Sequence, residues 1–460
     1  MTASLIGARL DRLPPTKSVR RLVVLLSLGG FFEFYDLLFS AYVAPGLVKA
    51  GILTATTRGF FGTTGVASFV AALFVGLFIG TAICGFLADR FGRRAIFTVS
   101  LLWYSAATVA MAMQTGVFGL NLCRLLAGIG LGVEMITIDT YVSELAPRAW
   151  RGRAMALNQT IQFSAVPVAA LLAWLLVPRA PLGIDGWRWV VMFGAVGSLV
   201  VWRIRRQLPE SPRWLAAHGR GEEADRIVAA LEAQAVAESG GGLEPAVAAE
   251  PESHRPGTGA MWTEMWRAPY LRRTLMLVVF NVFQTVGYYG FSAWVPTLLI
   301  QRGITVSTSL QYTFIIAIAA PFGPLLARAI ADRTERKWQI VGAALSIALC
   351  GLVFARMNAA VWIILTGAAI TLSNNILSVA FHAYQAELYP TRIRAMAVGF
   401  VYSWSRLSVV FSSFAIGFTL AEFGVNGVFT LIAGSMGVVI LAIGVMGPRT
   451  TRLGLEQISR

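Results

Sequence analysis

The segment Gly85-Phe-Leu-Ala-Asp89-Arg90-Phe-Gly92-Arg93-Arg94 is a short charged loop between two long apolar blocks. These blocks cover residues 65–87 and 95–114. Each is about twenty residues long, which is enough to cross a hydrocarbon core of about 30 Å. Inside such a core every backbone amide must be satisfied within its own segment, so both blocks are predicted to be transmembrane helices. Their polarity does not alternate, which excludes a transmembrane β-barrel.

The rest of the chain repeats this pattern of apolar blocks and short polar loops. Of its 460 residues, 56% are hydrophobic and only 13% are charged, whereas a soluble domain carries roughly a quarter of charged residues. The fold class predicted is therefore an all-α integral membrane protein with twelve transmembrane helices. The predicted spans are 22–48, 65–87, 95–114, 117–143, 153–177, 188–207, 272–299, 309–330, 339–356, 359–385, 396–420 and 425–447.

The formal net charge of +15 raises the alternative of nucleic-acid binding, but the basic residues do not form one stripe. They cluster in every second loop, at residues 9–21, 90–94, 148–153, 203–220, 333–337, 392–394 and 449–452. The alternate loops carry few, namely Arg58, Arg179, Arg302 and Arg356. This asymmetry follows the positive-inside rule. It predicts a multi-pass protein of the cell (inner) membrane with both termini cytoplasmic and the lipid bilayer, not nucleic acid, as its surroundings.

Several other classes of site are not expected. Cys84, Cys123 and Cys350 all lie in apolar blocks and form no disulfide framework. With three histidines and no cysteine cluster, we expect no metal site. No phosphate-binding glycine loop and no catalytic constellation is present, so neither a cofactor nor an enzymatic activity is predicted. The N-terminus lacks a short apolar run with a cleavage site, so no removable signal peptide is expected.

The two halves of the chain are repeats, because several polar positions recur at one constant offset of 243. Asp89-Arg90 recurs as Asp332-Arg333, and Arg93-Arg94 recurs as Arg336-Lys337. Glu144 and Arg151 recur as Glu387 and Arg394 at the same offset. Repeats of this kind predict two pseudo-symmetric six-helix bundles with a substrate site between them near the midplane. Such an arrangement is how alternating access is built.

The repeats give the following organisation. Residues 208–270 differ from the rest, because a plausible short helix at 222–235 is followed by a stretch rich in Gly, Glu, Pro and Ser that reads as a flexible linker. The expected units are an N-terminal cytoplasmic tail (1–21), a first bundle (22–207), this cytoplasmic loop (208–270), a second bundle (271–448) and a C-terminal cytoplasmic tail (449–460).

The stretch from Gly85 to Arg94 resembles the signature loop of the major facilitator superfamily, G-x-x-x-D-R-x-G-R-R, at every position. The second copy departs from it, with Arg328 and Glu335 in place of the glycines. The resemblance implies that acidic and basic members pair across the cytoplasmic seam and hold an inside gate shut. The alternative is that these residues are only inside-positive anchors.

Other loop elements resemble the same superfamily. Arg124 with Gly128, Gly130 and Gly132 is similar to its R-x-x-x-G-x-G element, in which glycines permit tight helix contact. The segments 144–153, 187–189 and 209–213 are similar to its sugar-porter and organic-ion branches. The resemblance implies gating roles for Gly85, Asp89, Arg90, Gly92, Arg93, Arg94, Arg124, Glu144, Arg151, Asp332, Arg333, Arg336, Glu387 and Arg394.

Charges within the predicted spans are costly and therefore functional by default. Glu33 and Asp36 in the first span are three residues apart, which puts both carboxylates on one helix face, expected to line a cavity. Because two close carboxylates repel and lose solvation, one of them is expected to take up and release a proton during transport. This pattern resembles the first helix of metabolite–proton and aromatic-acid–proton symporters. The alternative is a pair neutralised by an arginine, with no proton role.

Glu134 and Asp139 in the fourth span are the other candidates for proton coupling. They are five residues apart and share no face well, so only one is expected to line the cavity. Arg124 is a candidate partner of Glu134, although ten residues exclude contact within one helix. An internal ion pair without any role in coupling is the alternative.

Arg406 lies mid-span in the eleventh block, where a guanidinium is hard to explain as a membrane anchor. Its fork of donors can bind a carboxylate at two points. An arginine at this place resembles that of organic-anion carriers, where it is associated with the substrate carboxylate. The alternative is that Arg406 only pairs with a membrane acid. The other predicted substrate contacts are Tyr35, Gln162, Gln284, Tyr288, Tyr289, Asn374, Asn375, His382 and Trp404.

Acids in the first half and a base in the second would place protons and an anionic substrate on opposite sides of one cavity. The function predicted is proton-coupled symport of a small organic anion by a monomer. The alternatives are transport of a sugar or a neutral or cationic solute, or proton-driven export.

Overall fold

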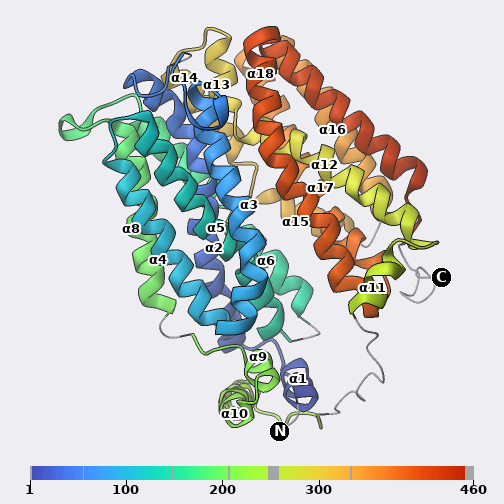
Figure 1. The fold of residues 1–460 in the computed structure, drawn as a ribbon. Coiled ribbons are helices and arrows are strands. Elements are labelled where there is room, and N and C mark those ends of the chain that lie inside the picture. Colours follow the sequence, from blue (N-terminus) through green and yellow to red (C-terminus); the bar gives the residue numbers. More distant parts are fainter. Residues whose placement is uncertain are drawn as a thin grey trace.

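The computed structural model describes residues 3–54, 56–147, 150–205, 208–246, 258–331 and 334–450. Within these ranges the chain is helical, apart from loops and one isolated bridge between Arg58 and Thr64. The helices form two bundles, one from each half of the chain, that lie beside each other (Figure 1). The predicted all-α fold with two bundles is confirmed.

The first bundle begins at Lys17, five residues earlier than predicted, because the hydroxyl of Thr16 caps the amide of Val19 at 3.3 Å. A short 3-10 turn, Phe60–Gly62, precedes its second helix. Its helices are α2 (Lys17–Lys49), α3 (Gly65–Phe91), α4 (Arg93–Ala112), α5 (Val117–Leu145), α6 (Arg151–Phe163), α7 (Ala165–Leu176) and α8 (Gly186–Arg205).

The second bundle follows α11 (Thr258–Met265). Its helices are α12 (Tyr270–Ser292), α13 (Val295–Gln301), α14 (Val306–Ala317), α15 (Phe322–Ala331), α16 (Arg336–Arg356), α17 (Ala360–Glu387) and α18 (Thr391–Met446). Gly424 interrupts α18 with φ 65° and ψ −164°, so this element consists of two helices that meet at a sharp turn.

In the described part of the chain, nine helices or helix pairs are long and apolar enough to cross a membrane. Two of these spans are broken helices, α6 with α7 and α14 with α15. The two helices of α18 are separate spans, and α3 and α8 complete the set of twelve predicted from the sequence.

Glycines on α3 and α5 bring these two helices into backbone contact. A Cβ atom at Gly76 would lie 2.1 Å from the carbonyl oxygen of Leu125, and one at Gly80 would lie 2.1 Å from that of Ile129. Gly128 and Gly132 on α5 meet α3 in the same way, with 2.3 Å to a carbonyl oxygen in each case. The spacing of four residues on both helices keeps these glycines on the facing sides.

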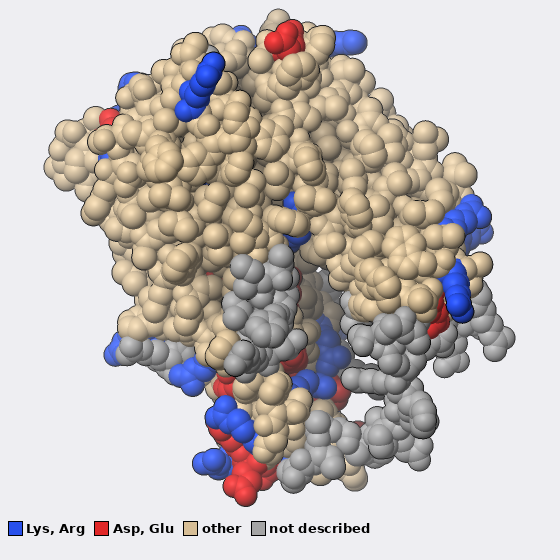
Figure 2. Space-filling model, in the orientation of Figure 1, with Lys and Arg blue, Asp and Glu red and all other residues tan. Residues whose placement is uncertain are grey.

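The two bundles touch each other at the end of the molecule away from the N-terminus. Trp174 on α7 stacks on Phe314 of α14, with 5.7 Å between ring centroids. Phe61 in the loop before α3 contacts Phe414 of α18 edge to face. Figure 2 shows the molecule hollowed between the bundles toward the opposite end, and few charged residues on the visible outer surface of either bundle at mid-height.

A small helical module lies below the first bundle, made of α1 (Ala3–Asp11), α9 (Pro212–Ala217) and α10 (Gly221–Ser239) (Figure 1). The sequence predicts a tail at α1 and a short helix at α10, yet the two segments pack together. The apolar side chains buried between them are Ile6, Leu10, Leu13, Trp214, Leu215, Ala224, Val228, Leu231 and Ala235.

Ion pairs hold this α1–α9–α10 module together and join it to the bundle. Arg9 and Arg12 each contact Glu232 at 2.6 Å. Asp11 contacts both Arg151 at the start of α6, at 2.6 Å, and Arg213 on α9, at 2.7 Å. The end of α1 is therefore fixed to a transmembrane helix and to the loop helix at once.

Gly76→Ala should destabilise the protein, because its methyl group would push α3 and α5 apart. Overpacking of this kind costs about 1–3 kcal/mol, which a thermal unfolding assay in detergent would detect as a lower melting temperature. Gly437→Ala is the matched control, because a Cβ atom there meets nothing within 4 Å. Equal melting temperatures for the two variants would contradict the close contact.

Acidification should release α1 from the module. The hydrogen bond from Arg9 lowers the pKa of Glu232 below its ordinary value of 4.5. Glu232 therefore stabilises the module fully above that ordinary value, and the stabilisation is lost as the pH falls through the lowered pKa. Amide hydrogen exchange of α1 should quicken over this range. Glu232→Gln should exchange faster already at pH 7, whereas the exposed Glu422→Gln should match the parent; a Glu232→Gln profile like the parent's would refute the role of this carboxylate.

Candidate functional site

A cavity of about 490 Å³ lies between the two bundles, on the side of the α1–α9–α10 module. Its wall comes from α2, α3, α5 and α6 of the first half and from α12, α17 and α18 of the second. The predicted residues in this wall are Glu33, Asp139, Gln162, Gln284, Tyr288, Tyr289, His382 and Arg406. Residues far apart in the sequence thus meet at one concave surface, as expected of a small-molecule site.

Arg406 on α18 is the basic residue of this wall. Its side chain is buried, and Nη2 donates a hydrogen bond to the hydroxyl of Tyr402, one turn earlier, at 2.9 Å. The guanidinium also lies 5.0 Å from the ring centroid of Tyr402 and contacts Tyr289. Its Nε has no hydrogen-bond partner among the described residues. Arg406 therefore keeps donor capacity for a bound group.

Two carboxylates lie in the wall contributed by the first bundle. Glu33 projects from α2 and is almost fully buried. Asp139 on α5 accepts a hydrogen bond from Nδ2 of Asn158 at 2.9 Å and contacts Gln162. Both carboxylates are near enough to Arg406 to interact with its charge. The cavity thus has an acidic side and a basic side.

Amide, hydroxyl and imidazole groups fill much of the remaining wall. His382 on α17 donates from Nδ1 to the carbonyl of Ser378 at 2.7 Å, so its Nε2 is left to face the cavity. Sequence reasoning missed Gln159, Gln385 and Tyr402, which also line it. Two of these could have been found from helical spacing, because Gln159 lies three residues before Gln162 and Tyr402 four before Arg406.

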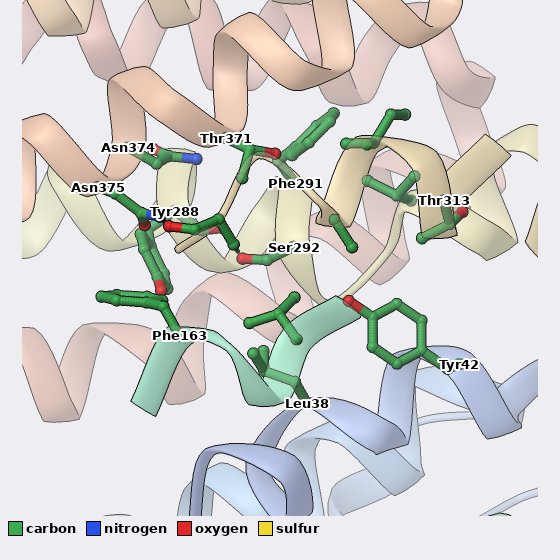
Figure 3. A pocket seen from close by; sticks show the side chains of 15 residues that line it. Leu38, Tyr42, Phe163, Tyr288, Phe291, Ser292, Thr313, Thr371, Asn374 and Asn375 are labelled. Atoms are coloured by element: carbon green, nitrogen blue, oxygen red, sulfur yellow. Dashed lines mark hydrogen bonds between the residues drawn. The ribbon is translucent and has the colours of Figure 1, made fainter. Parts of the chain in front are cut away.

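A smaller pocket of about 40 Å³ lies beyond the cavity, toward the end where the bundles touch. Asn374 and Asn375 are in its wall rather than in that of the main cavity, and Nδ2 of Asn375 donates to the carbonyl of Ala320 at 2.8 Å. Phe163 and Tyr288 belong to both walls. Figure 3 shows that the two asparagines gather with these two rings at one end of the pocket.

Two predicted substrate contacts are turned away from both cavities. Tyr35 is fully buried between α2 and α8, where its hydroxyl donates to the carbonyl of Val190 at 2.8 Å. Trp404 packs against Phe400, with 6.3 Å between ring centroids, and lies in neither wall. Their place on the helix, rather than their chemistry, decides this, because Tyr35 points toward α8 and Trp404 packs along α18 itself.

The sequence predicted that Asp36 lines the cavity beside Glu33, but the structure places it elsewhere. It faces α5, where Nη1 of Arg124 approaches its Oδ2 at 3.3 Å and Nη2 donates to its backbone carbonyl at 2.6 Å. Thr108 donates to the other carboxylate oxygen at 3.2 Å. The sequence offered Arg124 as a candidate partner of Glu134. The guanidinium of Arg124 instead reaches across to Asp36 on α2.

The Asp36–Arg124 pair is shielded from water. Neither side chain has more than 2% of its surface exposed. The guanidinium of Arg124 lies 4.5 Å from the ring centroid of Phe39 and 5.7 Å from that of Phe69. Glu134 is also buried but lies outside the cavity wall, so Asp139 is the acid of α5 that reaches it.

Each contact that the structure describes for a gate residue joins two residues of the same half. The carboxylate of Glu210 accepts the amide of Arg94 at 3.1 Å, and a Cβ atom at Gly92, with φ 93°, would lie 2.7 Å from it. Glu144 contacts Ser211, Arg336 pairs with Glu387, and Nε of Arg394 donates to the carbonyl of Tyr389. The side chains of Gly85, Asp89, Arg90 and Arg93 and the whole of Asp332 and Arg333 lie outside the described residues.

Comparison with known proteins identifies the family. Residues 22–460 match the profile of a family described as sugar (and other) transporter. The chain belongs to this transporter family. YyaJ of Bacillus subtilis, named for a predicted role in metabolite transport, is 31% identical over 442 residues, which are 96% of this chain and 95% of YyaJ. The niacin transporter NiaP of Acinetobacter baylyi is 28% identical over 452 residues, 98% and 99% of the two chains.

Solved structures of other transporters have the same fold as this chain. The xylose transporter XylE of Escherichia coli superposes with a TM-score of 0.73 at 19% identity, covering 94% of this chain and 98% of XylE. XylE is described as a major facilitator superfamily protein, and this chain shares its fold. The predicted resemblance to sugar porters is confirmed by the family match. The chain is a multi-pass membrane transporter of metabolites or sugars and not an enzyme.

Arg124→Gln should strongly destabilise the protein, because it leaves the carboxylate of Asp36 buried without its counter-charge. Breaking one partner of a buried pair costs about 3–5 kcal/mol, measurable as a loss of thermal stability in detergent. The double variant Asp36→Asn with Arg124→Gln should recover part of this loss, because no lone charge remains. Arg179→Gln, at an exposed loop, is the control; if Arg124→Gln unfolds at the same temperature as this control, the pair contributes no stability.

Proposed function

We propose that the chain is a proton-coupled secondary transporter that carries small organic anions by alternating access. The observation that supports this most directly is the buried guanidinium of Arg406 in the wall of the central cavity, opposite Glu33 and Asp139. A buried arginine is expensive unless a negative charge faces it. A substrate carboxylate can supply that charge at both points of the guanidinium fork.

The relatives support a carboxylate among the possible substrates. NiaP is named as a niacin transporter, and niacin is a pyridine carboxylic acid. The cavity offers Arg406 for the carboxylate and the rings of Tyr288 and Tyr289 for an aromatic body. Its volume of about 490 Å³ falls within the range of about 300–1,000 Å³ typical of small-molecule sites.

Four carboxylates within the spans are candidates to carry the proton: Glu33, Asp36 and Glu134, which are buried, and Asp139, which is exposed. Glu33 and Asp139 line the cavity, and Asp139, which is exposed, can exchange protons with water in it, whereas Glu33 is almost fully buried. Asp36 can act differently, because protonation would remove the charge that holds Arg124 and so loosen α2 from α5. A solved structure with the same fold is named as a D-xylose–proton symporter, which supports proton coupling on this scaffold.

The positive-inside pattern assigns the side of the α1–α9–α10 module, and both termini, to the cytoplasm. The cavity then faces inward, and the contacts of Trp174 with Phe314 and of Phe61 with Phe414 close the outer side. Rocking of the two bundles against each other would open the outer side and close the cytoplasmic side. We place the protein in the cell membrane and expect it to work as a monomer, because each chain contains a complete cavity.

A sugar is the second candidate substrate. Four glutamines, Gln159, Gln162, Gln284 and Gln385, line the cavity, and amides both donate to and accept from sugar hydroxyls. The family description names sugars as well. Arg406 would then be structural, with the cavity acids as its counter-charges.

Arg406→Lys should reduce uptake of radiolabelled nicotinate into proteoliposomes about 10- to 100-fold, equivalent to about 1.5–3 kcal/mol, because an ammonium cannot make the two-point contact. With the parent protein, an inward proton gradient should drive accumulation. Arg356→Lys, exposed at the end of α16, is the control. Unchanged nicotinate uptake by Arg406→Lys would remove this arginine from the site, and accumulation of xylose but not nicotinate would favour the sugar.

A further inference from the structure

The two signs of charge in the cavity come from different bundles. Glu33 on α2 and Asp139 on α5 belong to the first half, and Arg406 on α18 belongs to the second. His382, whose Nδ1 hydrogen is bound to a carbonyl, is the other basic group in the described wall. The tyrosines and amides that complete this wall are neutral. A bound solute therefore meets an acidic surface on one side and a basic surface on the other.

This arrangement is a poor match for a simple anion. With both acids ionised, the wall carries two negative charges against the one positive charge of Arg406. A solute with a single negative charge would increase the imbalance, and it would also displace cavity water that screens the two acids. Such an anion can bind only after an acid has taken up a proton.

A dipolar solute, with a positive and a negative end, matches the wall without this cost. Its carboxylate would face Arg406, and its positive end would face Glu33 and Asp139 at the same time. Aromatic side chains line the same wall: Tyr288 and Tyr289 lie edge to face, with 4.9 Å between ring centroids. The faces of such rings attract a cationic nitrogen and a flat heterocycle.

We propose that the transporter is selective for small carboxylates that also carry a cationic or protonatable nitrogen, with the carboxylate on Arg406 and the nitrogen toward Glu33 and Asp139. This rests on the proposed function and narrows its substrate class. A proton taken up with a simple anion and the positive end of a dipolar solute serve the same purpose, because each neutralises the acidic side of the cavity. A dipolar solute already carries its positive charge, so it binds at neutral pH.

Four related probes test the proposal: benzoate, nicotinate, N-methylnicotinate and N-methylnicotinamide. Benzoate has only the carboxylate, N-methylnicotinamide has only the cation, and N-methylnicotinate has both. Binding to the full-length protein in detergent is measured at pH 7 from the concentration that raises the melting temperature, and uptake is measured in proteoliposomes. N-methylnicotinate should bind at least about 10-fold more tightly than either single-charge probe, equivalent to about 1.4 kcal/mol.

The double variant Glu33→Gln with Asp139→Asn should lose this preference and bind benzoate as well as N-methylnicotinate. Each single variant should lose part of it, which keeps the test available if the double variant does not fold. Glu422→Gln, at an exposed position outside the cavity, should behave like the parent. A preference that survives in folded acid variants overturns the assignment of the nitrogen to these carboxylates.

The outcomes separate this inference from the proposed function. If benzoate binds and is accumulated as well as N-methylnicotinate, the dipolar preference is wrong while anion transport stands. If none of the four probes binds and neither labelled benzoate nor labelled nicotinate is taken up, the proposed function fails together with the preference. If N-methylnicotinamide binds most tightly, the cavity recognises cations and Arg406 has a structural role.

Discussion

An ionised side chain cannot stay in hydrocarbon without water or an opposite charge, and this requirement governs how both bundles are built. The chain meets it in two ways. Arg124 is closed off with Asp36 and two phenylalanine rings, which makes it part of the packing of α2 against α5. Arg406 instead faces an open cavity, where it contacts Tyr402 and Tyr289. The first arginine is satisfied by the protein itself, and the second is available to a solute.

Much of the fold could be predicted because a bilayer restricts the choices. Long apolar blocks must be helices, and a constant repeat offset fixed two bundles of six. The backbone contact of α3 with α5 was visible in part, in the spacing of Gly128 and Gly132. The sequence could not place Glu33 and Asp36 separately, because a spacing of three leaves them about 60° apart around the helix. Which of the two reaches the cavity depends on Arg124, 88 positions further along.

The N-terminal segment shows the same limit more clearly. Residues 1–21 read as a tail and 208–270 as a loop, since neither contains a span. Arg9 and Glu232, 223 positions apart, nevertheless form a two-point contact over a small apolar core. No local pattern reveals that two short amphipathic helices are partners. Tyr35 and Trp404 were misplaced for a related reason, because their chemistry suits a binding site while the neighbouring helices determine where they point.

Phe163 and Tyr288, the two rings shared by the large cavity and the small pocket, have a consequence for energy conservation. They belong both to the wall of the large cavity, on the side of the α1–α9–α10 module, and to that of the small pocket, toward the end where the bundles touch. A partition of aromatic side chains supports no continuous chain of water, and a hopping proton requires such a chain. The membrane potential would fall mainly across this short insulating layer. Small ions would then be unable to leak past an empty carrier, although a solute that moves both rings could still pass.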